Sequence, residues 1–275
     1  MSSSLLRIRY NPDGTAFNEA FETAIRDNGL LDYDAMMALD RGEVVKHAIP
    51  QRKTVVFTLR DGSRAYLKRH FPAGFLSALK KLLLLSPEPT AFDEFENIIA
   101  FQRADLPAVA PIAAGRKRGS FLVTQALDGC TRLDDYLVQT QLERAALEKL
   151  TCHVAGLIRK MHACGFNHRD LYLCHILRDV RGDLCIVDLH RVQRRVAVPE
   201  RWRVKDIAAL NYSAPAGIIS RTNRLRFLKT YLGRERLTAR DKSFALKILK
   251  KTRKMVEHNK RSNEKCQLSI DELSL

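Results

Sequence analysis

The sequence predicts an α+β fold with two lobes: a small lobe of mostly antiparallel strands with one or two helices, and a larger, mainly helical lobe. Three observations support this prediction. Short apolar strand patterns cluster between residues 44 and 68, a long amphipathic helix pattern covers residues 142–164, and a hairpin pattern follows at residues 176–187. With 275 residues, of which 45% are hydrophobic, the chain can bury a large core, and its length fits either one two-lobed domain or two small ones.

The predicted organisation has four parts. They are an N-terminal extension at residues 1–40, the small lobe at 41–125, the large lobe at 126–233 and a basic helical extension at 234–275. The N-terminal extension contains one short helix pattern, Ala16 to Arg26, and no residues that suggest chemistry. We expect it to pack on the rest of the fold.

Strand patterns fill the small lobe. They cover Val44-Val45, Thr54 to Leu59, Ala65 to Lys68, Val109 to Ala113 and Phe121 to Thr124. Asp61-Gly62 stands between two of these runs, and this pair is a strong signal for a hairpin turn. Helix patterns lie at Phe71 to Leu85 and Phe92 to Phe101, and the first, with basic flanking residues, would cover the small lobe or lie in a membrane interface. Gln125 to Asp128 is the expected hinge between the lobes.

The clearest helix pattern opens the large lobe. Its apolar stripe runs from Leu147 to Met161, and Gly165 follows as expected of a residue just past a helix C-cap. The helix leads directly into the segment Asn167-His168-Arg169-Asp170. We expect a further helix to begin at Asp206, which would cap it or brace the loop that contains Asp170.

A short hairpin follows that loop. Ile176-Leu177 and Leu184 to Val187 are strand patterns, and Arg181-Gly182-Asp183 between them supplies the turn. Because a hairpin brings its two flanks together, Asp170 and Asp188 are expected to meet at a common cleft. Two such aspartates suit phosphoryl transfer, in which one holds a magnesium ion against the phosphates and the other orients and deprotonates the attacking hydroxyl.

This stretch resembles the catalytic loop and the metal-binding Asp-Phe-Gly element of protein kinases. More closely, Asn167-His168-Arg169-Asp170-x-Tyr172-x-x-His175 with Ile186-Val187-Asp188-Leu189-His190-Arg191 resembles the bacterial lipopolysaccharide core heptose kinase family. The resemblance runs from about Gly42 to about Gly233. It implies a protein-kinase-like fold, ATP and Mg²⁺ as substrate and cofactor, and phosphorylation of a heptose hydroxyl of the lipopolysaccharide inner core.

The resemblance also implies roles for individual residues. Asp170 would be the catalytic base, Arg169 would brace the loop, and His175 would assist the metal or the acceptor. Asp188 would hold the metal. Lys68 would bind the nucleotide phosphates and Glu94 would position Lys68 through an ion pair, with Glu96 as the rival acidic residue.

Three departures from the protein-kinase pattern stand out. His175 occupies the position of an asparagine metal ligand, although magnesium prefers oxygen to imidazole, so a second metal site is in doubt. His190 replaces the glycine of the Asp-Phe-Gly element, which reduces backbone freedom there. A glycine-rich phosphate loop is missing because Gly42 stands alone, and Arg52 or Lys53 would help to cover the nucleotide instead.

The formal charge of +16 predicts an anionic partner. A basic segment from Arg191 to Lys205 stands where protein kinases have an activation segment, and it suits an acceptor that bears carboxylates and phosphates. The basic tail would make peripheral contact with the cytoplasmic face of the inner membrane. No signal peptide or apolar run of eighteen residues is present, so we expect a cytoplasmic protein, and no aromatic-rich motif suggests nucleic acid.

Two alternatives stay open at this point. An aminoglycoside-type phosphotransferase would use the aspartates in the same way. Its acceptors are polycations that require an acidic pocket, and the basic charge of this chain argues against such a pocket. A basic pseudokinase or nucleic-acid binder would use the arginine cluster and turn over no nucleotide. Oligomeric state, the number of metal ions and the hydroxyl that is phosphorylated do not follow from the sequence.

Overall fold

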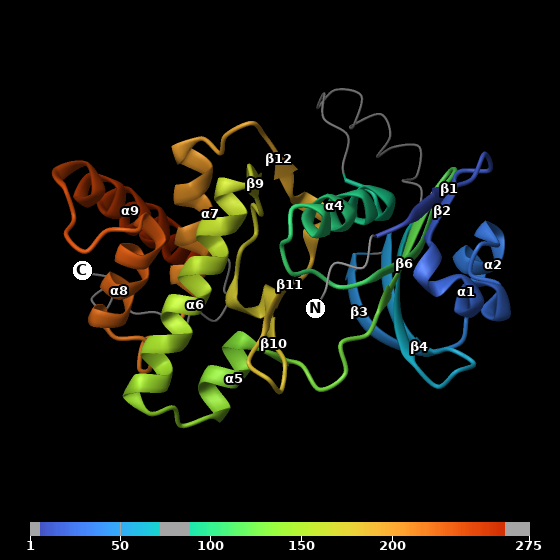
Figure 1. Cartoon of the computed structure of the whole chain (residues 1–275), viewed down its shortest axis with the longest axis horizontal. Helices are drawn as coiled ribbons and strands as arrows, with labels where there is room; N and C mark the ends of the chain where they lie inside the picture. The colour runs from blue at the N-terminus through green and yellow to red at the C-terminus, as the bar shows by residue number, and fades with distance from the viewer. Residues whose placement is uncertain (1–5, 50, 72–88, 262–275) are drawn as a thin grey trace. The chain divides into compact units, whose positions relative to one another are not determined.

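A computed structural model describes residues 6–49, 51–71 and 89–261, with side chains described outside residues 46–49 and 259–261. The chain forms two compact units (Figure 1). The first comprises residues 1–128 with 188–190, and the second comprises residues 129–187 with 191–275. Helices and strands both contribute, and every strand pair among the described residues is antiparallel, which confirms an α+β composition.

The first unit is built on a seven-stranded sheet with strand order β1-β2-β6-β7-β5-β4-β3. Its elements are β1 (Ile8–Tyr10), β2 (Thr15–Asn18), α1 (Glu22–Asn28), α2 (Tyr33–Ala38), β3 (Glu43–Ile49), β4 (Arg52–Thr58), β5 (Arg64–His70), α4 (Ala91–Arg103), β6 (Pro111–Arg116) and β7 (Ser120–Gln125). The main apolar core joins one face of the sheet to α1 and α2 through residues such as Ile25, Phe57 and Phe121. Helix α4 packs against β6 and β7.

Two sequence predictions for this unit need correction. The helix pattern at Ala16 to Arg26 is wrong over its first part, because Thr15–Asn18 forms β2 and the α-helix begins only at Glu22. Strand β2 pairs with both β1 and β6, so tertiary pairing overrides the local helix signal. The predicted helix at Phe71 to Leu85 lies, beyond Phe71, outside the described residues.

The second unit is mainly helical. Its elements are β8 (Thr131–Arg132), α5 (Leu133–Gln139), α6 (Arg144–Ala163), β9 (Phe166–Asn167), β10 (Ile176–Arg178), β11 (Leu184–Ile186), β12 (Gln193–Arg194), α7 (Glu200–Ser213), α8 (Arg221–Leu232) and α9 (Ala239–Arg261). Helix α6 packs against α8 and α7 packs against α9 (Figure 1). Strand β10 lies between β11 and β8 in a small sheet. None of the described helices is long and apolar enough to cross a membrane.

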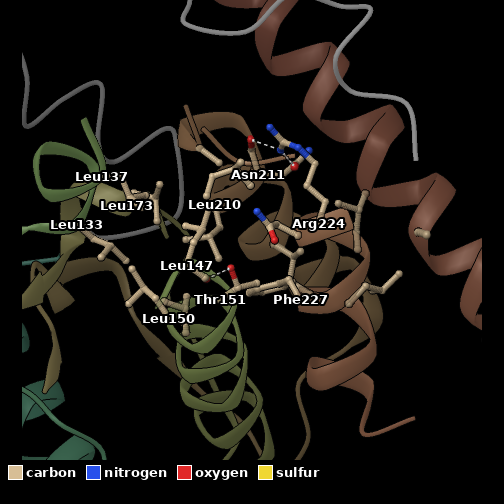
Figure 2. A pocket seen from close by; sticks show the side chains of 18 of the residues that line it. Leu133, Leu137, Leu147, Leu150, Thr151, Leu173, Leu210, Asn211, Arg224 and Phe227 are labelled. Carbon is tan, nitrogen blue, oxygen red and sulfur yellow. Dashed lines mark hydrogen bonds between the residues drawn. The ribbon is translucent and has the colours of Figure 1, made fainter. Parts of the chain in front are cut away.

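Helices of the second unit surround an apolar cavity of about 110 Å³. Figure 2 shows leucine side chains of α5, α6 and α7 around the cavity, and Phe227 of α8 also lines it. Asn211 and Arg224 supply polar groups, with the Arg224 guanidinium donating to the backbone carbonyl of Asn211 at 3.2 Å. Leu173, three residues after Asp170, also lines the cavity, and its backbone N–H donates to Ser213 Oγ.

Candidate active site

Lys68 lies at the centre of the candidate site in the first unit. Side chains alternate along β5, so Leu67 enters the core while Lys68 projects from the opposite face of the sheet. Its Nζ lies 2.6 Å from Glu94 Oε1 on α4 and 3.5 Å from Asp188 Oδ1. The structure therefore brings together three of the residues that the sequence singled out.

The Lys68–Glu94 ion pair is well shielded, because only 4% of the Glu94 side chain is exposed. Burial lowers the pKa of Lys68, but the carboxylates of Glu94 and Asp188 outweigh it and raise the pKa above its ordinary value. Lys68 therefore keeps its charge. The rival acid, Glu96, instead accepts a hydrogen bond from the Tyr10 hydroxyl at 3.3 Å.

Asp188 has an unusual backbone conformation, with a φ of +61°. This left-handed conformation costs a non-glycine residue roughly 1–2 kcal/mol, so neighbouring contacts must hold it. His190 Nδ1 lies 2.8 Å from Asp188 Oδ1, and Asn97 of α4 donates to the backbone carbonyl of Leu189 at 2.8 Å. Since the positive φ falls on Asp188, a histidine at position 190 is compatible with this turn.

Basic residues also lie near Lys68. Burial lowers the pKa of His70 to about 4, and the charges of Arg52, His190 and Lys68 add to this effect. His70 is therefore neutral at physiological pH. Glu94 is buried in its ion pair with Lys68, whereas Asp188 is partly exposed, so Lys68, Arg52 and Asp188 together suit a metal-bound polyphosphate, which carries negative charge.

In the second unit, Gly165 controls how the chain leaves α6. It has a φ of +85°, and a Cβ at this position would collide with the backbone carbonyl of Arg195. Gly165 in turn accepts a hydrogen bond from the Arg195 N–H at 2.8 Å, and β9 then pairs with β12. The glycine predicted beyond the C-cap thus also allows the close approach of the two backbones directly before the loop that contains Asp170.

Asp206 holds that loop from below. It lies inside α7 and is fully buried, and its carboxylate accepts the backbone N–H groups of His168 and Arg169, each at 2.7 Å. Because α7 begins at Glu200, the prediction that Asp206 opens a helix is wrong. Its alternative role as a brace for the loop is confirmed.

A chain of hydrogen bonds extends from Asp206 to α8. His162 of α6 contacts Asp206 Oδ2 through Nε2 at 3.2 Å and the Tyr231 hydroxyl through Nδ1 at 2.8 Å. Burial raises the pKa of Tyr231 to about 12, so the phenol keeps its proton. Because a carboxylate only accepts hydrogen bonds, Nε2 of His162 is the donor in the contact with Asp206.

Arg169, like Asp188, has a left-handed backbone conformation, with a φ of +74°. The hydrogen bond from its N–H to Asp206 stabilises this conformation, and its guanidinium lies 5.4 Å from the centre of the Trp202 ring. The left-handed residue immediately precedes Asp170, so it determines the direction in which the Asp170 side chain leaves the loop.

Asp170 is held in two ways. Its backbone carbonyl accepts from the Tyr172 N–H at 3.0 Å and from His175 Nδ1 at 2.7 Å. Its Oδ2 accepts from Arg191 Nη1 at 2.7 Å, while Lys205 Nζ stands 4.0 Å from Oδ1. Among the described residues no donor lies within hydrogen-bonding distance of Oδ1, so this oxygen can accept a hydroxyl proton.

His175 serves the loop and the hairpin together. Its ring nitrogen Nδ1 donates to Asp170, and its backbone carbonyl accepts from the N–H of Val187, the residue that precedes Asp188. Strands β10 and β11 pair as predicted, with Ile176 opposite Ile186. The ring also lies 5.8 Å from that of His168, nearly parallel to it.

The described residues fit magnesium that is bound together with nucleotide phosphates, but not a metal held by protein side chains alone. The described residues contain no group of three or more His, Cys, Asp or Glu side chains arranged to hold a metal. Magnesium that arrives with nucleotide phosphates needs only one or two carboxylates, because phosphate oxygens and water complete its shell. Asp188 meets that requirement, whereas His175 offers an imidazole whose Nδ1 already binds Asp170.

Sequence reasoning missed several residues of this site. His162 and Tyr231 gave no signal, because both read as ordinary helix residues. Arg191 and Lys205 were recognised only as members of a basic segment, and their contacts with Asp170 depend on tertiary packing.

Comparisons with known proteins identify the family of this chain. The chain is 33% identical over 260 residues to the lipopolysaccharide core heptose(I) kinase of Pseudomonas aeruginosa, which spans 85% of this chain and 93% of that protein. It is 32% identical over 209 residues to the lipopolysaccharide core heptose(I) kinase of Escherichia coli K12, covering 70% of this chain and 78% of that protein. Residues 37–231 match the model of the lipopolysaccharide kinase (Kdo/WaaP) family. The chain therefore belongs to the lipopolysaccharide kinase (Kdo/WaaP) family.

Proposed function

We propose that this protein is an ATP-dependent kinase that phosphorylates a heptose hydroxyl of the lipopolysaccharide inner core. Two relatives that are named as lipopolysaccharide core heptose(I) kinases match most of the chain. The residues that match the family model, 37–231, include every residue proposed for the site. The observation that carries the proposal is the buried carboxylate of Asp206, which fixes the backbone of His168 and Arg169 directly before Asp170.

In this proposal the two units correspond to the two lobes of a protein-kinase-like fold. The first unit supplies the nucleotide side. Lys68, oriented by Glu94, binds phosphate oxygens of ATP, and Asp188 holds the metal against the same phosphates. Magnesium bound there supplies positive charge that neutralises the phosphates during transfer.

The second unit supplies the acceptor side. Asp170 receives the proton of the attacking hydroxyl on Oδ1, because Arg191 already occupies Oδ2. Arg169 keeps Asp170 aimed through its backbone, and His175 keeps the loop closed against the hairpin. The hydroxyl oxygen then attacks the terminal phosphorus of ATP while the bond to the leaving ADP oxygen breaks.

The test is ADP release from ATP and magnesium with a purified heptose-containing core acceptor. Asp170→Asn and Asp188→Asn should each lower kcat by at least about a hundredfold, the range of a lost general base or metal ligand. Asp27→Asn, on the exposed surface of α1, is the matched control and should behave as wild type. Equal rates in all four proteins would reject the proposal.

We also propose that the protein contacts the inner membrane from its cytoplasmic side. The exposed face of α9 carries six cations, Arg240, Lys242, Lys247, Lys250, Arg253 and Lys254, and the acidic residue Glu257. Each cation near an anionic leaflet contributes about 1 kcal/mol. Sedimentation with anionic vesicles that weakens as salt rises, and that is absent with neutral vesicles, is expected. Equal sedimentation with both vesicle types would contradict this contact.

A further inference from the structure

The acceptor side of the site has more cations than its own carboxylates can neutralise. Arg169, Arg195, Arg201 and Lys205 all lie within 6 Å of the centre of the Trp202 ring, at 5.4, 5.9, 5.4 and 5.7 Å. With Arg191, this cationic cluster contains five positive groups. Within the described part of the chain, Asp170 contacts Arg191 and lies near Lys205, and Asp206 also acts on Lys205.

Neither carboxylate is able to balance this charge. Asp206 is fully buried and is engaged by two backbone N–H groups and His162. Asp170 forms one close ion pair, with Arg191. Like charges so close to one another repel, and a bound anion would relieve that repulsion.

Lys205 is the cation best placed to receive such an anion. Its Nζ lies 4.0 Å from Asp170 Oδ1, which is too far for a hydrogen bond. Because Oδ1 is the oxygen assigned to accept the hydroxyl proton, Lys205 lies next to the place of the reacting hydroxyl. Its side chain is 27% exposed, so it is partly desolvated yet still accessible. Burial lowers the pKa of Lys205; Asp170 opposes that effect, and Arg191 and Arg169 add to it. A partly desolvated lysine among arginines is therefore short of a counter-charge.

We propose that Lys205, together with the arginines around Trp202, binds an acidic group of the acceptor that lies next to the reacting hydroxyl. This inference rests on the proposed function, because it assigns the group that the acceptor must carry. The recognised chemistry is an oxyanion, a carboxylate or a phosphate, for which lysine and arginine are both suited.

The test measures the Kd of three forms of one heptose-containing core oligosaccharide by calorimetry without ATP. The forms are intact, methyl-esterified at the carboxyl groups, and phosphatase-treated. Wild type should bind the intact form about tenfold to a hundredfold more tightly than the form that lacks the recognised group, as expected for a charge-assisted hydrogen bond. The form that loses affinity identifies the source of the oxyanion.

Variants assign the effect to Lys205. Lys205→Gln should bind all three forms with equal, weak affinity, and Lys205→Arg should restore most of the preference. Lys149→Gln, an exposed residue of α6, makes the same change in charge and should match wild type. Circular dichroism would verify that the variants are folded.

Two results would overturn the inference. The first is that wild type and Lys205→Gln show the same preference among the three forms. The second is that Lys205→Gln lowers kcat without changing any acceptor Kd, because that result would assign Lys205 to the transferred phosphoryl group. Failure of the proposed function is a separate result, because it appears as absent phosphorylation while the Kd values still report on oxyanion binding.

Discussion

Replacing Asp206 by asparagine tests how the catalytic loop is held. The carboxylate accepts three hydrogen bonds, from the N–H groups of His168 and Arg169 and from His162. Asparagine has the same shape but only one acceptor oxygen, so its NH₂ group must face at least one of these donors. One charge-assisted hydrogen bond is lost and a buried N–H is left without a partner. Together these effects should cost about 3–5 kcal/mol of unfolding free energy.

The catalytic consequence follows from the backbone of Arg169. Without the carboxylate, its left-handed conformation loses the contact that stabilises it, and the loop can relax by releasing roughly 1–2 kcal/mol of strain. A displacement of Asp170 by about 1 Å would lower kcat by about a hundredfold. The KM for ATP should stay near wild type, because Lys68, Glu94 and Asp188 contact one another within the first unit.

Urea unfolding and ADP release with acceptor would measure both effects. Asp241→Asn is a suitable control, because Asp241 is also buried but accepts hydrogen bonds from Thr238 at the start of α9. That substitution should cost about 1 kcal/mol or less and leave kcat unchanged. If Asp206→Asn matched this control in both urea midpoint and kcat, the carboxylate would not be what holds the loop.

Three further predictions concern other parts of the site. Glu94→Gln removes the charge that orients Lys68 and should raise the KM for ATP by about tenfold or more, measured by initial rates, and an unchanged KM would contradict the ion pair. Gly165→Ala places a Cβ against a backbone carbonyl and should lower the unfolding free energy by at least about 2 kcal/mol, a loss that urea titration would detect or refute. His70 stays neutral in the folded state with a pKa of about 4, so the unfolded chain takes up its proton first as pH falls below about 6.5. Stability should therefore decrease from pH 6.5 towards 4, less steeply in His70→Gln, and identical slopes would reject this assignment.

The second half of the fold could be predicted well from the sequence because its signals are local. The apolar stripe of α6, the glycine after it and the turn between β10 and β11 all act over a few residues. At Ala16 the same kind of reasoning failed. The strand formed by Thr15–Asn18 depends on pairing with β6, nearly a hundred residues further along the chain.

The choice between Glu94 and Glu96 shows a second limit. Both residues lie on the predicted helix, and neighbours two positions apart point in different directions around a helix. Only the packing of α4 against the sheet decides that Glu94 meets Lys68 and that Glu96 meets Tyr10.

The sequence by itself determined the two aspartates, the hairpin between them, and the strand that contains Lys68, since each belongs to a short motif with its own physical signature. Strand β5 runs from Arg64 to His70, so Lys68 lies within the strand and does not end it as predicted. Only the tertiary structure decided what holds these residues in place. Asp206 reaches His168 across 38 positions and Arg191 reaches Asp170 across 21. Such contacts depend on how helices and loops pack, and no periodicity within one segment records which distant partner its side chains will meet.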